Sequence, residues 1–197
     1  METERLDDFY RIQSRFYDLT RPFFLLDRKR ALSSIQFNRR DQVLDLACGT
    51  GMNIPYISSV VDRDNITGID YSESMLKKAR HKFPDMNFVR ADVSDFEFNM
   101  RFDKIVCTYS LSMIDRWRET IQNARDHLSQ NGLFLILDFN RWDRFRPLYS
   151  PFRRWLNIHG VDPEKDYVSE LSGNFQGIDR HVLNLGYNQL IIAHRNI

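Results

Sequence analysis

The stretch Val43–Asn53 constrains the fold of this chain more than any other. An apolar run that carries Asp45 breaks into a loop with glycines at positions 49 and 51, and apolar residues at helical spacing follow from position 52. A strand that leads into a glycine-bearing turn and then a helix lets a ligand approach bare backbone. The stretch therefore predicts a ligand site at the carboxyl end of the first strand.

After position 42, apolar and polar residues alternate in blocks that predict strand, helix and strand in turn. This alternation is typical of an α/β fold with a doubly wound, mostly parallel sheet that binds ligand at the carboxyl ends of its strands. A closing antiparallel hairpin over 180–194, with Gly186 as its turn, would bring the sheet to about seven strands. Residues 92–100 are interpreted as a short helix or a loop. The predicted strands are Val43–Ala47, Asn65–Asp70, Met86–Ala91, Phe102–Thr108 and Leu133–Asp138, and the predicted helices are Asn53–Val61, Ser72–Phe83 (with Ser72 as N-cap) and Trp117–Leu128.

We expect one domain over residues 1–197, with a helical cap (1–40), a ligand-binding core (41–140), a basic aromatic lid (141–178) and a closing hairpin (179–197). Residues 5–35 are interpreted as two helices interrupted at Pro22. They either pack on the core or cover the ligand while an outer face meets a membrane. Residues 141–155 hold five arginines, one aspartate and five aromatic side chains. That composition suits a lipid headgroup interface, a protein interface or a nucleic-acid groove.

The net charge of +1 conceals an uneven distribution. Residues 41–140 hold 11 basic and 15 acidic side chains (net −4), residues 1–40 hold 9 and 6 (net +3), and residues 141–197 hold 8 and 6 (net +2). The central part thus has no basic stripe, which argues against a nucleic-acid partner. Without an apolar signal core or a membrane-spanning run, the chain is expected to be cytoplasmic. Cys48 and Cys107 are expected to be buried free thiols, and no metal-ligand spacing appears.

The first loop does not fit a dinucleotide. The fingerprint for NAD needs a third small residue where Ile54 stands, and Asp45 suits a cofactor with a positive charge better than a pyrophosphate. Asp70 lies 19 residues after Gly51, at a strand tip where an acid can accept hydrogen bonds from both ribose hydroxyls. Asp92 follows the third predicted strand and is placed to meet an adenine amino group. Three acids at successive strand ends indicate a nucleoside that carries a cation.

These motifs resemble class I S-adenosylmethionine-dependent methyltransferases over essentially the whole chain. Asp45–Gly51 matches the family's acidic, glycine-rich loop, with Ala47 in the place of its first glycine. The resemblance implies a Rossmann-like fold, S-adenosyl-L-methionine as cofactor and S-adenosyl-L-homocysteine as product. The other matching segments are Ile69–Ser72 (ribose-binding motif), Ala91–Val93 (adenine-binding motif), Phe102–Cys107 (fourth strand) and Asn131–Phe134 (turn into the fifth strand).

Methyl transfer from a sulfonium requires an acceptor in line and the exclusion of water, and an amine acceptor must also lose a proton. Tyr17, Tyr109 and Asp138 are the candidate catalytic residues, although Asp138 could be a structural acid and Tyr109 a packing residue. Where nucleic-acid base methyltransferases carry Asp/Asn-Pro-Pro-aromatic, this chain reads Cys107–Ser110, which argues against base methylation. The expected cofactor-binding residues are Tyr17, Asp45, Ala47, Gly49, Gly51, Asn53, Asp70, Tyr71, Met75, Asp92, Val93, Thr108 and Tyr109.

Two segments narrow the resemblance. Phe16–Arg21 is similar to the segment before the core in quinone and phospholipid methyltransferases, where the tyrosine closes over the cofactor. Tyr109–Trp117 is similar to the segment after strand four in bacterial lipid N-methyltransferases, which act on phosphatidylethanolamine or on the homoserine headgroup of betaine lipids. The leading expectation is methyl transfer to a lipid headgroup amine, with residues 1–30 and 141–156 docked on an anionic inner membrane face. A quinone or other small-molecule acceptor and a non-catalytic binding module are the alternatives, and no oligomeric state is assigned.

Overall fold

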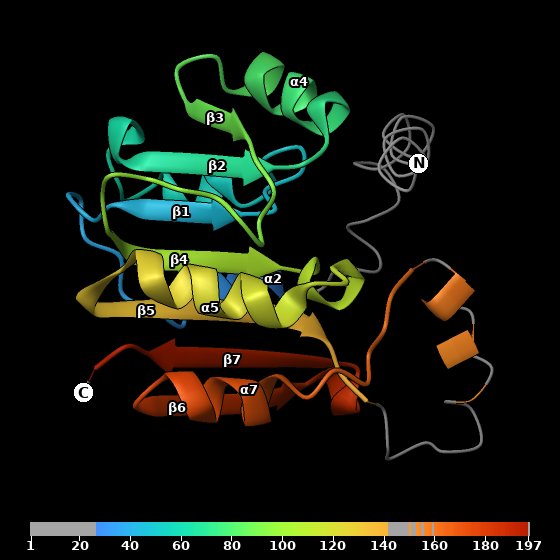
Figure 1. The fold of residues 1–197 in the computed structure, drawn as a ribbon. Coiled ribbons are helices and arrows are strands. Elements are labelled where there is room, and N and C mark those ends of the chain that lie inside the picture. The colour runs from blue at the N-terminus through green and yellow to red at the C-terminus, as the bar shows by residue number, and fades with distance from the viewer. Residues whose placement is uncertain (1–26, 142–149, 151–152, 155, 159, 197) are drawn as a thin grey trace. The chain divides into compact units, whose positions relative to one another are not determined.

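The computed structural model describes residues 27–141, 150, 153–154, 156–158 and 160–196. It divides between Glu97 and Phe98 into two compact units, which are described separately. Three strands of the first unit and four of the second make up a seven-stranded, mostly parallel sheet with an antiparallel hairpin at its C-terminal end (Figure 1). The expected α/β fold class is confirmed. Of the expected N-terminal helices, only residues 27–35 lie within the described part of the chain.

The first unit contains a parallel sheet with the strand order β3-β2-β1. Every side chain of β1 is buried, as in a parallel strand that is covered on both faces. The predicted strands are confirmed to within one residue at each end. The elements are α2 (Arg28–Leu32), β1 (Val43–Leu46), α3 (Ile54–Ile57), η1 (Arg63–Asn65), β2 (Ile66–Asp70), α4 (Glu73–Lys82) and β3 (Asn87–Arg90).

Two helix predictions in this unit need correction. The helix after the glycine loop ends at Ile57 instead of Val61, because Ser58, Ser59 and two valines follow, all weak helix formers. Ser72 does occupy the N-cap position of α4 with an extended backbone, but its side chain makes no capping bond. The Ser72 hydroxyl instead lies 2.9 Å from the hydroxyl of Ser74. Residues 92–100 form a loop, one of the two alternatives left open.

The second unit has the strand order β4-β5-β7-β6, with β4 and β5 parallel and the β5–β7 and β7–β6 pairs antiparallel. The strand predicted over Leu133–Asp138 is longer in the structure, because β5 begins directly after α5 and its pairing with β4 shifts register between Phe102 and Lys104. One helix, α7, was not predicted, since residues 141–178 were interpreted only as a lid. The elements are β4 (Phe102–Thr108), η2 (Leu111–Met113), α5 (Trp117–His127), β5 (Leu128–Phe139), α7 (Tyr167–Asn174), β6 (Gly177–Leu183), η4 (Asn184–Gly186) and β7 (Asn188–His194).

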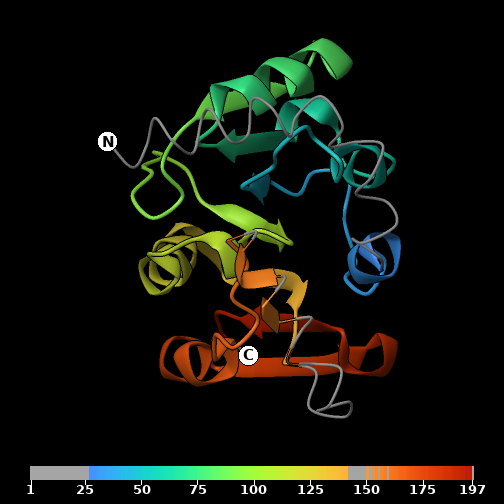
Figure 2. The same cartoon turned by 90° about the vertical axis from the view of Figure 1, so that its right-hand side faces the viewer.

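Helices α5 and α7 lie on the same face of the strands of the second unit (Figures 1 and 2). The rings of Trp117 and Tyr167 meet edge to face, with centroids 5.5 Å apart. The guanidinium of Arg118 lies 4.2 Å from the centroid of the Trp117 ring, and its Nε lies 3.4 Å from Glu170 Oε2. These contacts fix α7 against α5. No helix among the described residues has the length and apolar content to cross a bilayer.

Candidate cofactor loop and acceptor cavity

The loop after β1 has the left-handed backbone that its glycines predict. The φ angles are 54° at Ala47, 56° at Gly49 and 80° at Gly51. A Cβ added at Gly49 would meet no described residue within 4 Å, so the described part of the chain leaves this side of the loop open. A Cβ at Gly51 would lie 3.0 Å from the ring of Phe83. The loop thus packs on the protein at Gly51 and presents bare backbone at Gly49.

Asp70, at the end of β2, ties this loop to the start of α4. The backbone N–H of Gly49 donates to Asp70 Oδ2 and that of Ser72 donates to Asp70 Oδ1, both at 2.8 Å. The side chain is half-buried. Each carboxylate oxygen can accept a second hydrogen bond. Asp70 is therefore rigidly oriented between the glycine loop and the start of α4.

Asp45 is fully buried at the end of β1. Asn53 Nδ2 donates to Asp45 Oδ1 at 2.6 Å, and Arg28 Nη1 donates to Asn53 Oδ1 at 2.6 Å. Asp45 Oδ2 has no hydrogen-bond partner among the described residues. Burial raises the pKa of Asp45 to about 7, against the hydrogen bond from Asn53 and the charge of Arg28, while the charge of Asp70 raises it further.

The remaining expected cofactor residues of the first unit differ in exposure. Arg90 lies over the ring of Tyr71 at 5.4 Å, and its Nε donates to the Tyr71 carbonyl at 3.1 Å. Asp92 is exposed, and its Oδ1 accepts hydrogen bonds from the backbone N–H (2.9 Å) and the hydroxyl (2.7 Å) of Ser94. Met75 and Val93 are buried. Tyr17 lies outside the described residues.

The first unit fits a nucleoside that carries a cation. The unpartnered oxygen of Asp45 suits an ammonium group, because a buried carboxylate oxygen without a donor is costly. The described residues leave room for a ligand at the backbone of Gly49, which Asp70 holds in place. Of the three acids predicted from the strand ends, Asp45 and Asp70 lie among the last two residues of β1 and β2, and Asp92 lies two residues after β3. Among the residues that the structure describes, no group of three or more His, Cys, Asp or Glu could hold a metal ion.

In the second unit, Tyr109 follows β4 with a φ of 55°, which is strained for a tyrosine. The side chain is buried, its hydroxyl accepts a hydrogen bond from Asn188 Nδ2 at 3.0 Å, and its ring packs 5.4 Å from that of Phe139. Thr108 is also buried. Tyr109 is thus held at the carboxyl end of β4 by contacts with β5 and β7.

Asp138 is enclosed by donors. Ser112 donates to it from its backbone N–H (2.8 Å) and its hydroxyl (2.7 Å), and the N–H of Phe139 donates at 2.8 Å. The hydroxyl of Tyr167 lies 3.4 Å from Oδ2. Burial raises the pKa of Asp138 in spite of these bonds. The arrangement anchors the loop after β4 to β5, as a structural acid would.

Lys165 anchors the same loop and was not identified from the sequence. Its Nζ donates to the carbonyls of Leu111, Ser112 and Ile114 at 3.2, 2.9 and 2.7 Å. Burial lowers the pKa of Lys165, against the charge of Asp138. Arg28, which donates to Asn53 in the first unit, was also not identified from the sequence. These partners are 25 to 54 residues apart in sequence, so no local pattern could have found either side chain.

A cavity of about 780 Å³ lies within the second unit, at the carboxyl end of β5. Residues after β5, at the start of α7, and in and around the β6–β7 turn form its wall. Its volume falls within the range of small-molecule sites. The lining residues are Asn140, Arg141, Pro163, Glu164, Lys165, Asp166, Tyr167, Val168, Arg180, Val182, Leu185, Gly186 and Gln189.

Comparisons with known proteins agree with the fold and the loop. A family model described as a methyltransferase domain matches residues 43–132. A putative methyltransferase of Invertebrate iridescent virus 6 is 26% identical over 92% of this chain and 80% of its own length. The malonyl-[acyl-carrier protein] O-methyltransferase of Bacillus anthracis is 28% identical over 59% of this chain, which spans only 44% of that protein.

One solved structure illustrates the shared fold. An S-adenosylmethionine-dependent methyltransferase from Thermotoga maritima, described as a possible histamine N-methyltransferase, superposes with a TM-score of 0.72 at 12% identity. The superposition covers 96% of this chain and 97% of that one. At this identity the similarity extends to the fold alone.

Proposed function

We propose that this chain, whose residues 43–132 match a methyltransferase domain, transfers a methyl group from S-adenosylmethionine to a small organic acceptor held in the cavity of its second unit. The methyltransferase family match confirms the expected enzyme class and cofactor. The observation that carries the acceptor proposal is the cavity itself, about 780 Å³ with both charged and apolar walls. A concave site of this volume supports a compact acceptor better than a flat surface would.

The first unit would hold the cofactor through the acids described above. Asp45 Oδ2 accepts from the ammonium group, Asp70 from the ribose hydroxyls and Asp92 from the adenine amino group. Gly49 allows close approach of the backbone. The bound cofactor supplies a methyl group that is already activated on sulfur, so the protein has to orient an acceptor and exclude water. The other residues expected from the sequence to contact the cofactor are proposed to line its site as well.

The candidate catalytic residues receive different roles in this proposal. Asp138 acts as a positioning residue, because Ser112, Phe139 and Tyr167 occupy its oxygens. Tyr109 is the candidate for contact with the reacting atoms, because a strained backbone at a strand end is typical of functional sites.

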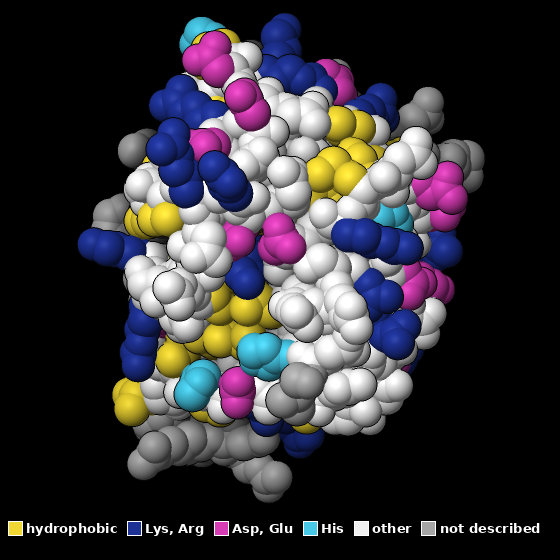
Figure 3. Space-filling model, turned by 90° about the vertical axis from the view of Figure 1, so that its left-hand side faces the viewer, with side chains coloured by type: hydrophobic (Ala, Val, Ile, Leu, Met, Phe, Trp, Pro, Cys, Tyr) yellow, Lys and Arg dark blue, Asp and Glu magenta, His cyan; other side chains and the backbone are white. Residues whose placement is uncertain are grey.

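A lipid headgroup amine is the second candidate acceptor. Ile158 is 72% exposed and shares a shallow surface with Arg153 and Arg154, which are also exposed. An apolar side chain among arginines suits an anionic membrane. The rest of residues 1–30 and 141–156, which carry this expectation, lies largely outside the described part of the chain. On the face drawn in Figure 3, acidic side chains lie among the Lys and Arg side chains, unlike a basic nucleic-acid stripe.

The test is a methyl-transfer assay with labelled S-adenosylmethionine and a panel of acceptors. The panel holds small carboxylic acids, phenols, a short-chain quinol, small amines and vesicles of phosphatidylethanolamine with an anionic lipid. Transfer to a small molecule, with none to vesicles, is the expected result. Transfer to vesicles alone would replace the proposal with the lipid function. Cofactor binding without transfer to any acceptor would favour a non-catalytic module.

A further inference from the structure

The cavity of the second unit is walled on one side by an arginine whose position is fixed by two amides. Arg180, on β6, donates from Nε to Gln189 Oε1 at 3.1 Å and from Nη2 to Asn140 Oδ1 at 2.9 Å. All three residues line the cavity. Gln189 comes from β7, and Asn140 directly follows β5. The guanidinium of this β6 residue is therefore held by two other segments of the unit.

The two amides cannot turn away from Arg180 without losing other bonds. Gln189 Nε2 donates to the carbonyl of Phe139 at 3.2 Å, and Asn140 Nδ2 donates to the carbonyl of Gly186 at 3.0 Å. Both amide residues are buried, with 3% and 9% of their surface exposed. Because each NH₂ group already has a backbone acceptor, each amide oxygen faces the guanidinium. The plane of Arg180 is set before any ligand arrives.

This arrangement uses two of the N–H donors of the guanidinium and leaves three, two of them on Nη1. A guanidinium has five N–H donors, and the two amides take one on Nε and one on Nη2. Arg180 has no carboxylate partner among the described residues, and Nη1 makes no hydrogen bond to them. Two parallel N–H groups on one edge match the two oxygens of a carboxylate.

The acids that line the cavity are engaged elsewhere. Glu164 Oε1 accepts from Arg153 Nη1 at 2.8 Å, and Asp166 caps α7 by accepting from the N–H of Ser169 at 3.1 Å. Apolar and aromatic side chains, among them Tyr167 and Val182, complete the wall. An oriented cation beside apolar surface suits an organic acid better than a neutral or cationic ligand.

We propose that Arg180 anchors the carboxylate of an organic acid bound in this cavity, and that this acid is the methyl acceptor. The inference rests on the proposed function and names its substrate class. It concerns binding, through two parallel hydrogen bonds to the terminal edge of Arg180. The amide pair Gln189 and Asn140 positions the guanidinium without contacting the acid.

The test measures binding in the absence of cofactor. Calorimetric titrations with malonate and benzoate are carried out on the full chain and on the variants Arg180→Gln, Arg180→Lys and Arg63→Gln. Arg63 lies in the first unit and is exposed, so its variant removes the same charge away from the cavity. At least one of the two acids is expected to bind, about tenfold or more weaker with Arg180→Gln. Arg180→Lys should recover only part of the loss, and Arg63→Gln should change nothing.

Several results would overturn the inference: no binding of either acid to the unaltered chain, equal binding by Arg180→Gln, or preference for inorganic phosphate over both acids. If Arg180→Gln does not fold, as judged by its melting curve, Gln189→Glu serves in its place. A carboxylate at position 189 neutralises Arg180 internally, so acid binding should fall. Turnover separates the two proposals. Transfer to a neutral acceptor without acid binding overturns this inference alone. Acid binding without any transfer overturns the proposed function and the role of the acid as acceptor, and leaves Arg180 as an acid-binding residue only.

Discussion

At the scale of single residues, Asp45 has the most unusual environment in the first unit. It is fully buried, one carboxylate oxygen accepts from Asn53, and the other has no partner among the residues described. Its pKa of about 7 places the change of charge near neutral pH. A cationic ligand group would favour the charged form, so ligand binding and proton release should be coupled.

The first prediction concerns this coupling. Because an ammonium group requires the carboxylate form of Asp45, affinity for S-adenosylmethionine should rise about tenfold between pH 5.5 and pH 7. An α-amino group keeps its proton over this interval, so the slope reports Asp45. Calorimetry at both pH values measures it, and Asp45→Asn should bind weakly with no such slope.

An unchanged slope in Asp45→Asn would assign the titration to another group.

For the protein without ligand, the pH dependence of stability has the opposite sign to that of affinity. The folded-state pKa of about 7 lies above the ordinary value of 3.8, so the stability that this carboxyl contributes is complete below pH 3.8 and is lost as the pH rises toward 7.

The second prediction concerns Ala47, which stands where the family loop has a glycine. Its φ of 54° costs a residue with a Cβ about 1 kcal/mol. Ala47→Gly should therefore raise the free energy of unfolding by about that amount, as measured by urea titration. The matched control is Ala31→Gly, in α2, where the added backbone freedom should lower it. A loss of stability in Ala47→Gly would mean that contacts of the methyl group outweigh the strain.

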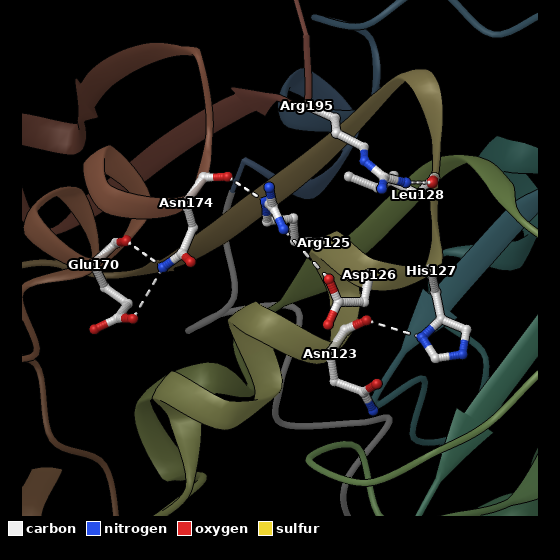
Figure 4. A network of polar contacts seen from close by, with 8 residues as sticks. All are labelled: Asn123, Arg125, Asp126, His127, Leu128, Glu170, Asn174 and Arg195. Carbon is white, nitrogen blue, oxygen red and sulfur yellow. Dashed lines mark hydrogen bonds and ion pairs between the residues drawn. The ribbon is translucent and has the colours of Figure 1, made fainter.

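At the scale of elements, the loop after β4 is held in place by side chains from later in the chain. Asp138 on β5 accepts from Ser112, and Lys165 donates to three carbonyls of the same loop. A separate set of hydrogen bonds lies at the C-terminal end of α5 and is shown in Figure 4. Arg125 Nε donates to the carbonyl of Asn174 at 2.5 Å, which joins the end of α5 to that of α7.

The third prediction tests the first of these anchors. Ser112→Ala removes one donor from a fully buried carboxyl, which should cost about 1–3 kcal/mol of stability. Urea titration measures the loss. Ser172→Ala is the control, because that exposed hydroxyl bonds only to a carbonyl of its own helix. Equal effects of the two changes would show that Asp138 does not need this donor.

The sequence predicted the strands better than the helices. β4 was predicted residue for residue, because its apolar run is bounded by clear breaks. The start of β5 was missed, since Leu128–Gly132 is polar and pairs with β4 only through a register shift. α7 was missed because its stability depends on contacts with α5 that no local pattern encodes.

At the scale of the whole molecule, the two functional regions differ in how far they could be predicted. The acids of the first unit could be predicted because they lie at strand ends, and parallel strands bring their carboxyl ends to one edge of the sheet. Arg180 and Lys165 could not be predicted, because their partners lie on other elements and become neighbours only after folding. The lipid expectation depended on flanks that lie mostly outside the described residues.

The central claim is that the acids at the strand ends of the first unit hold S-adenosylmethionine. Calorimetric titration of the unaltered chain and of Asp70→Ala tests it most directly, with the exposed Asp85→Ala as control. The unaltered chain and the control should bind S-adenosylmethionine alike, and Asp70→Ala should bind at least about tenfold more weakly, because it loses two hydroxyl bonds and the tie to Gly49. Equal affinity in Asp70→Ala, or no binding by the unaltered chain, would contradict the account.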